Sequence, residues 1–280
     1  MAYLLAIGSA VLYGAADFTG GLTTRRASTI PVVLLSQAAG LIMLALIMPL
    51  LPHASPARAD VLWGAAAGLT GGIGVALLYH ALATGTMAVV APTTAVCAVA
   101  IPVVVSVLLG ERPMPLAVAG IALGMVSIVL VSQEQGGAQP RSRPSGVGSA
   151  LASGIAIGLF LLSFAQAGPG AGMWPLLVAR TVSTTLFAVT AIAGGRSLRM
   201  PAPVTALVIV AGVMDMLANA LYLLATRQGP LSIVVTLSSL YPASTVLLAR
   251  IVLGERLRPW QITGVGCALT AVVLIVSGGR

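Results

Sequence analysis

Three charged residues lie inside long apolar stretches of this sequence and are the first candidates for chemistry. Asp17, Arg180 and Asp215 are each surrounded by mostly apolar residues over about a dozen positions. A charge surrounded by nonpolar groups is costly unless it is paired or hydrogen-bonded. Each of the three is therefore a candidate for binding a proton, an ion or a polar ligand.

Asp215 begins a polar stripe. Asn219 follows at i+4 and Tyr222 at i+7, and residues at these spacings share one face of a helix. An acid, an amide and a phenol on one face would form the polar wall of a binding cavity. The alternative is a buried hydrogen-bond cluster that only holds helices together. We favour the cavity wall.

Asp17 and Arg180 each have a functional and a structural interpretation. Asp17 lies four or five residues before the first apolar run ends, about 7 Å at 1.5 Å per residue. It could bind and release a proton, or it could pair with Arg25 or Arg26. Arg180 lies about seven residues into its run. It could bind a carboxylate or phosphate in bidentate fashion, or it could pair with Asp17 or Asp215.

Five further residues complete the candidates. Gln37 and Tyr79 lie in apolar runs and are added to the binding residues, although Tyr79 also suits an interfacial aromatic belt. Pro92, Pro102 and Pro242 are expected inside helices, where each removes a backbone hydrogen bond and permits a kink. They are candidate hinges, or else fixed packing kinks.

The composition predicts the elements that position these residues. Hydrophobic residues make up 58% of the chain and charged residues only 7%, against about 25% charged in soluble proteins. Apolar runs of about 20 residues can span a bilayer as helices. We therefore expect an all-α integral membrane protein with ten transmembrane helices, at about 2–21, 31–51, 60–82, 87–109, 114–132, 146–166, 173–194, 203–225, 230–252 and 258–277.

The two halves of the chain repeat at an offset of 144 residues. The tetrad Leu109–Arg112 recurs at Leu253–Arg256, and further matches at this offset are Gly14 with Gly158, Pro31 with Pro175, Gly68 with Gly212, Gly85 with Gly229 and Gly120 with Gly264. A polar linker, 133–145, separates repeats 1–132 and 146–280. Five helices is an odd number, so the repeats should have inverted topology, which in transporters places a substrate site at the repeat interface near the midplane.

The tetrads themselves fall at helix connections on opposite membrane faces. Glu111 and Glu255 are expected to stay solvated there. Arginine asymmetry bears on orientation: four arginines flank the helices on the side of the termini and eight on the other side. That count predicts external termini, because basic residues are enriched in cytoplasmic loops.

Several classes of function are excluded or disfavoured. Cys97 and Cys267 lie in apolar runs with no ligand cluster nearby, so neither a metal nor another cofactor is expected. There is no nucleophile–base pair that would indicate an enzyme. The chain lacks lysine and any Gly-x-x-x-x-Gly-Lys motif, which excludes direct ATP drive within this subunit. The arginines lie between apolar runs, so a nucleic-acid partner is not expected.

The motifs in the second half resemble those of a known family. Leu240-Tyr241-Pro242-Ala243-Ser244-Thr245, the tetrad at 253 followed by Leu257, and Gly264 resemble the EamA-type drug/metabolite transporter pattern. The first half carries its tetrad and Gly120 in register, but it has Ala98 opposite Pro242. Tyr13-Gly14 stands where Trp-Gly is common.

The resemblance implies a ten-helix secondary carrier, commonly an exporter, with a central cavity among helices 1–4 and 6–9. It also implies cytoplasmic termini, opposite to the arginine count. We expect a secondary active transporter, acting as an exporter by alternating access. Two acids suit cations and Arg180 suits carboxylates, so a zwitterion such as an amino acid is a candidate substrate.

Two alternatives remain, namely efflux of cationic compounds by proton antiport and, in a different class, a pore or channel. The expected location is a bacterial inner (plasma) membrane. The expected partners are a small-molecule substrate and the lipid bilayer, with the protein a monomer or homodimer.

Overall fold

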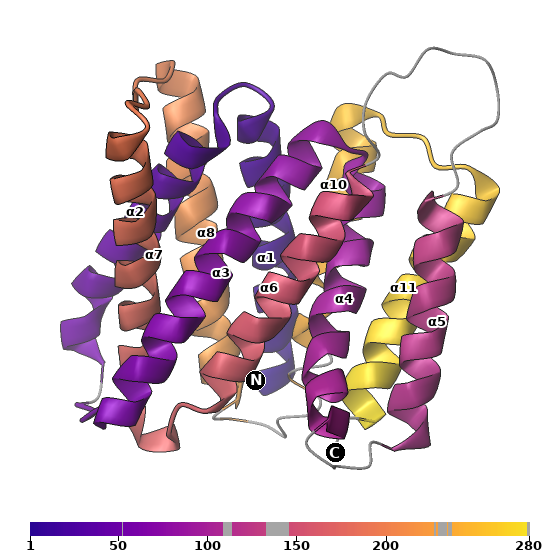
Figure 1. The fold of residues 1–280 in the computed structure, drawn as a ribbon, viewed down its shortest axis with the longest axis horizontal. Coiled ribbons are helices and arrows are strands. Elements are labelled where there is room, and N and C mark those ends of the chain that lie inside the picture. The colour runs from indigo at the N-terminus through magenta and orange to yellow at the C-terminus, as the bar shows by residue number, and fades with distance from the viewer. Residues whose placement is uncertain are drawn as a thin grey trace.

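The computed structural model describes residues 1–51, 53–108, 114–132, 146–226, 228, 234 and 237–278. Within these residues the protein is all-helical, without strands. The α-helices, numbered as in Figure 1, are α1 (Ala2–Thr24), α2 (Thr29–Ile47), α3 (Arg58–Thr84), α4 (Met87–Leu108), α5 (Pro115–Ser132), α6 (Val147–Ala165), α7 (Trp174–Ala193), α8 (Ala202–Thr226), α10 (Tyr241–Leu253) and α11 (Pro259–Gly278). Short 3-10 turns occupy Met48–Leu50 and Pro169–Ala171.

These helices have the dimensions of membrane spans. Among the described residues, α1, α3, α6, α7, α8, α11 and α2 with its 3-10 extension are long and apolar enough to cross a bilayer. The apolar stretches described in α4, α5 and α10 are shorter. The expected all-α architecture with ten helices is confirmed, and the tetrad at 109 and the linker at 133–145 lie outside the described residues.

One expected helix is interrupted by a turn. In the span expected at 230–252, the described residues 234 and 237–238 are helical, a turn follows at 239–240, and α10 starts at Tyr241. Pro242 is therefore in the first turn of a helix and not in its interior, which corrects the prediction. Proline suits this position because its missing N–H would have no partner in a first turn anyway.

Helices pack mainly against the other half of the chain. Three of these contacts occur twice, once for each half of the chain. The contact of α1 with α8 is matched by that of α6 with α3, and the contact of α1 with α10 by that of α6 with α4. The contact of α2 with α8 is matched by that of α7 with α3. Two further cross-half pairs are α2 with α7 and α5 with α11, and α5 and α11 form the right-hand edge of the bundle in Figure 1. Because the contacts cross between halves, neither half has a separate core.

Buried hydrogen bonds between helices recur at the 144-residue offset. Four of them form two pairs, and within each pair the two donors are 144 positions apart and so are the two acceptors. In the first pair, Ser9 Oγ donates to Ala218 O (2.8 Å) and Ser153 Oγ donates to Gly74 O (2.8 Å). In the second pair, Thr94 Oγ1 donates to Ala150 O (3.2 Å) and Ser238 Oγ donates to Ala6 O (3.4 Å). The sequence offset thus relates contacts in space as well as residue types.

Glycines at equivalent positions allow the closest helix contacts. A Cβ atom at Gly68 of α3 would lie 2.8 Å from the Cα of Ala179 on α7. A Cβ atom at Gly212 of α8 would lie 2.9 Å from the Cα of Ser36 on α2. Real Cβ atoms do not approach backbone this closely, so only glycine permits these helices to touch as they do.

Replacing Gly212 with alanine is expected to destabilise the protein by about 1–3 kcal/mol, because α8 must move away from the backbone of α2. The measurement is reversible unfolding in detergent micelles. Gly266→Ala on α11 is the matched control, since a Cβ atom there meets nothing within 4 Å. It should unfold like the parent or later, and equal loss in both variants would contradict this account.

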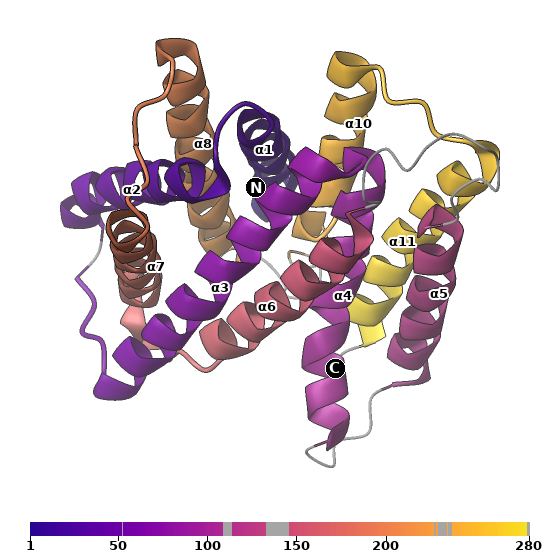
Figure 2. The same cartoon turned by 45° about the horizontal axis from the view of Figure 1, so that its top comes forward.

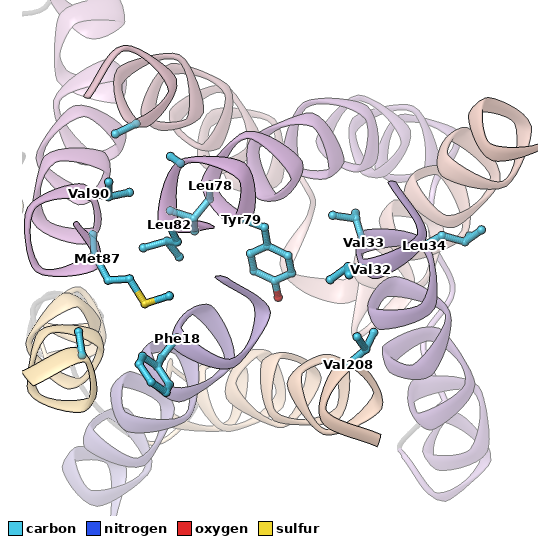
Figure 3. Packing of buried hydrophobic residues seen from close by; sticks show 14 of the residues in the cluster. Phe18, Val32, Val33, Leu34, Leu78, Tyr79, Leu82, Met87, Val90 and Val208 are labelled. Atoms are coloured by element: carbon cyan, nitrogen blue, oxygen red, sulfur yellow. The ribbon is translucent and has the colours of Figure 1, made fainter. Parts of the chain in front are cut away.

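The largest apolar cluster surrounds the upper half of α1 and α3. It includes Phe18, Leu82, Met87 and Val90, all at most 5% exposed. Tyr79 belongs to the same cluster but directs its hydroxyl away from Leu78 and Leu82, as Figure 3 shows.

Candidate functional site

Arg180 and Asp215 form an ion pair in the middle of the bundle. Arg180 Nη2 donates to Asp215 Oδ2, and Arg180 Nη1 donates to Gln37 Oε1. Ser183 also donates its hydroxyl to Gln37 Oε1, at 3.2 Å. Arg180 is 9% exposed and Gln37 3%, so this network joins α2, α7 and α8 away from water.

Asp17 lies nearby without a partner. Within the described residues its carboxylate makes no hydrogen bond or ion pair, although it lies within electrostatic reach of Asp215. The alternative pairing with Arg25 is not formed, because Arg25 pairs with Glu255 at 3.4 Å. We call Asp17, Arg180 and Asp215 the charged cluster. Arg180 pairs with Asp215, so within the described residues Asp17 is the acid of this cluster without an ion-pair partner.

Asp17 is also deeper than predicted. α1 continues to Thr24, so seven residues follow Asp17 in the helix, about 10 Å instead of 7 Å. The adjacent glycines, Gly20 and Gly21, do not end the helix. They face the Tyr79 ring and Leu82 so closely that a Cβ atom at either position would overlap these side chains.

Three tyrosines border the charged residues. Tyr79 is only 2% exposed, so the interfacial-belt interpretation is wrong and its place among the candidates rests on burial. Tyr13 and Tyr79 both lie within electrostatic reach of Asp17, Arg180 and Asp215. The ring of Tyr241 meets that of Tyr13 edge to face, with centroids 6.2 Å apart.

The three residues of the predicted stripe on α8 have different neighbours. Asn219 donates its side-chain N–H to the carbonyl of Asp215 one turn earlier, at 2.8 Å, which stabilises α8 itself. Tyr222 packs against an apolar cluster that includes Ala2 and Ala6, and it lies within electrostatic reach of Tyr13. Of the three, only Asp215 lies within the network of Arg180.

The prolines of α4 differ from that of α10. Pro92 and Pro102 lie inside α4, as expected. The hinge role of all three prolines stays a prediction, although Pro242 in the first turn of α10 removes no hydrogen bond from the interior of that helix.

Tyr13 and Ser183 lie at the site but were not predicted as site residues from the sequence. Tyr13 precedes Asp17 by four positions and Ser183 follows Arg180 by three, so helical spacing places each beside a charged residue. That spacing was the available signal. Which neighbouring helix each residue faces is a property of the assembled bundle.

Glu255 is not left in solvent as predicted. Its side chain is 13% exposed, and it accepts hydrogen bonds from the backbone N–H groups of Met87 and Ala88. The connection between α10 and α11 folds back over the start of α4, which removes the carboxylate from water.

Two surface grooves lie away from the charged cluster. One is mostly apolar, lies between α3 and α7 and includes His80 and Phe187. The other surrounds the connection between α10 and α11 and includes Arg250 and Arg256. Neither groove includes any residue of the Arg180 network.

Comparison with known proteins identifies the family. The family model of the EamA-like transporter family matches residues 1–133 and 144–277. The chain belongs to the EamA-like transporter family. It is thus a membrane transporter of the drug/metabolite transporter superfamily, as its motifs predicted, and an integral multi-pass membrane protein.

Structure comparison agrees at the level of fold. A solved chain, titled only as the crystal structure of a protein, is similar over 98% of this EamA-like chain and 95% of its own length. The TM-score is 0.60 and the sequence identity is 16%. A search among curated proteins returned no match.

Proposed function

We propose that this EamA-like protein is a secondary active exporter of a small organic solute, with its substrate site at the charged cluster. The observation that carries the proposal is Asp17, a carboxylate deep in the bundle with no partner among the described residues. A charge retained at such depth is costly, and in membrane proteins such residues mark substrate, ion or proton pathways.

The transport cycle is alternating access between two inverted repeats. The hydrogen bonds that recur at the 144-residue offset support this. Ser9 of the first half donates to Ala218 of the second, and the equivalent Ser153 of the second half donates to Gly74 of the first. The charged cluster draws on both halves, with Asp17 and Gln37 from the first and Arg180 and Asp215 from the second. Rocking of one half against the other would expose such a site to each face in turn.

The charge balance favours cations among the candidate substrates. A zwitterion needs a free positive group for its carboxylate, but Arg180 already pairs with Asp215. Among the described residues of the cluster, Asp17 is the acid without an ion-pair partner. When ionised it offers a negative charge to an organic ammonium group, and the rings of Tyr13 and Tyr241 nearby suit such a group. Efflux of an amine in exchange for a proton is therefore the preferred form, ahead of amino-acid export.

The remaining properties follow from this scheme. The single chain supplies both halves of the site, so a monomer suffices for transport. Its partners are the substrate and the bilayer, and no nucleic acid or cofactor is needed. The location is the inner (plasma) membrane of a bacterium, where a proton gradient supplies the driving force.

The test is transport in proteoliposomes that contain the purified protein. Organic amines, amino acids and monocarboxylates are compared with and without an imposed pH gradient. We expect saturable movement of amines, coupled to proton flow in the opposite direction. Saturable transport of carboxylates alone would refute the cation assignment, and unsaturable flow independent of any gradient would favour a pore.

A further inference from the structure

Glu255 joins two parts of the chain that are far apart in sequence. From the connection between α10 and α11, its Oε1 accepts the N–H of Met87 at 3.2 Å and its Oε2 accepts the N–H of Ala88 at 3.0 Å. These are unsatisfied donors in the first turn of α4. A negative charge at this end of a helix is also favourable to the helix dipole.

Arg25, just after α1, completes the arrangement. Its Nη2 lies 3.4 Å from Glu255 Oε1 and 3.3 Å from the carbonyl oxygens of both Leu82 and Gly85. Arg25 thus binds the end of α3 while Glu255 binds the start of α4. We call this pair, with the four backbone groups that it binds, the clasp.

The clasp lies at one membrane face, above the charged cluster. It is at the face where α1, α3 and α10 end and α4 begins, the upper face in Figure 1. Figure 2 turns the top of the bundle towards the viewer, and the ends of α1, α3 and α10 lie together on this upper side. Asp17, Tyr79 and Tyr241 lie on these same helices, nearer the centre of the bundle.

We propose that Glu255 is the residue that holds this face of the transporter closed. It is a positioning residue: it does not touch substrate, and it acts by tying α10 and α11 of the second half to α1, α3 and α4 of the first. If the halves rock apart, these bonds must break for the upper face to open. The inference rests on the alternating access proposed above.

The opposite face lacks an equivalent pair in its sequence. At the offset of 144, Glu111 corresponds to Glu255, but Pro169 corresponds to Arg25. Glu111 lies outside the described residues. The sequence thus repeats the glutamate of the clasp at this offset but not its arginine.

The experiment measures accessibility and does not depend on substrate. In a Cys97→Ala, Cys267→Ala background, Thr23→Cys reports on the upper end of α1, where Thr23 is fully buried. Ala6→Cys, also buried, reports on the opposite end of α1. A membrane-impermeant maleimide is applied to reconstituted protein, with Glu255→Gln compared to the parent and to Arg256→Gln, an exposed neighbour.

We expect Glu255→Gln to raise the labelling rate of Thr23→Cys by at least about tenfold and to leave that of Ala6→Cys equal or slower. Arg256→Gln should change neither rate. Unchanged labelling of Thr23→Cys overturns the proposal. Faster labelling at both reporters also overturns it, since that is general loosening of the fold. If labelling follows the expectation and no solute is transported, the clasp stands and the proposed function fails.

Discussion

Asp215→Asn is expected to destabilise the protein by about 2–3 kcal/mol and to lower transport at least tenfold, while membrane insertion persists. The change keeps the shape of the side chain but leaves Arg180 buried without its ion-pair partner. Breaking a buried pair in this way costs about 3–5 kcal/mol. The lower figure is expected here because 11% of the Arg180 side chain and 18% of the Asp215 side chain remain accessible. Unfolding in detergent micelles and transport in vesicles are the two measurements.

The double variant Arg180→Gln/Asp215→Asn separates the pair's structural and transport roles. It removes both charges together and retains amide groups that can hydrogen-bond with Gln37. We expect it to recover most of the lost stability but not transport. Full transport by Asp215→Asn alone would contradict a place for this pair in the site, and unchanged stability would contradict its burial.

Asp17→Asn is expected to lower the affinity for substrate without lowering the stability of the protein. Because Asp17 has no partner within the described residues, its neutralisation breaks no ion pair and should leave the free energy of unfolding equal or raise it, since an unpaired charge at this depth is costly. Losing a charge that pairs with a desolvated substrate costs about 2–5 kcal/mol, so affinity for a cationic substrate should fall at least about thirtyfold. Saturation curves in proteoliposomes, with proton flow recorded in parallel, measure this effect.

Thr19→Val is the control for Asp17→Asn. Thr19 is two residues away on α1, and its hydroxyl donates only to Ala15 O of the same helix, at 2.7 Å. This variant should transport like the parent. If Asp17→Asn retains the affinity and the proton coupling of the parent, the carboxylate is not the binding group and the cation assignment is lost.

The helices and the charged residues were predictable from the sequence because both depend on local composition. Apolar runs long enough to span a bilayer predicted where most helices begin and end, to within a few residues. Asp17, Arg180 and Asp215 were identified because charges are rare in such runs. These predictions need no knowledge of which helices touch.

The partners of the charged residues were not predictable in the same way. Arg180 had two candidate acids, and the choice of Asp215 depends on how α7 and α8 pack together. Tyr79 lies near a helix end, which suggested an interface, but the close approach of Gly20 places it in the core. Glu255 follows a helix end, where solvation is the ordinary outcome, and only the folded connection brings it to α4.

The interleaving of the two halves has a consequence for how the protein is made. Asp215 is only 35 residues from Arg180, so these charges can neutralise each other soon after α7 and α8 leave the ribosome. The bond from Ser9 to Ala218 spans 209 residues, and α1 must wait for α8 before that contact forms. Synthesis at about 5–20 residues per second makes this delay ten seconds or more. During that time α1, with Asp17 on it, lacks the helix against which it packs most extensively.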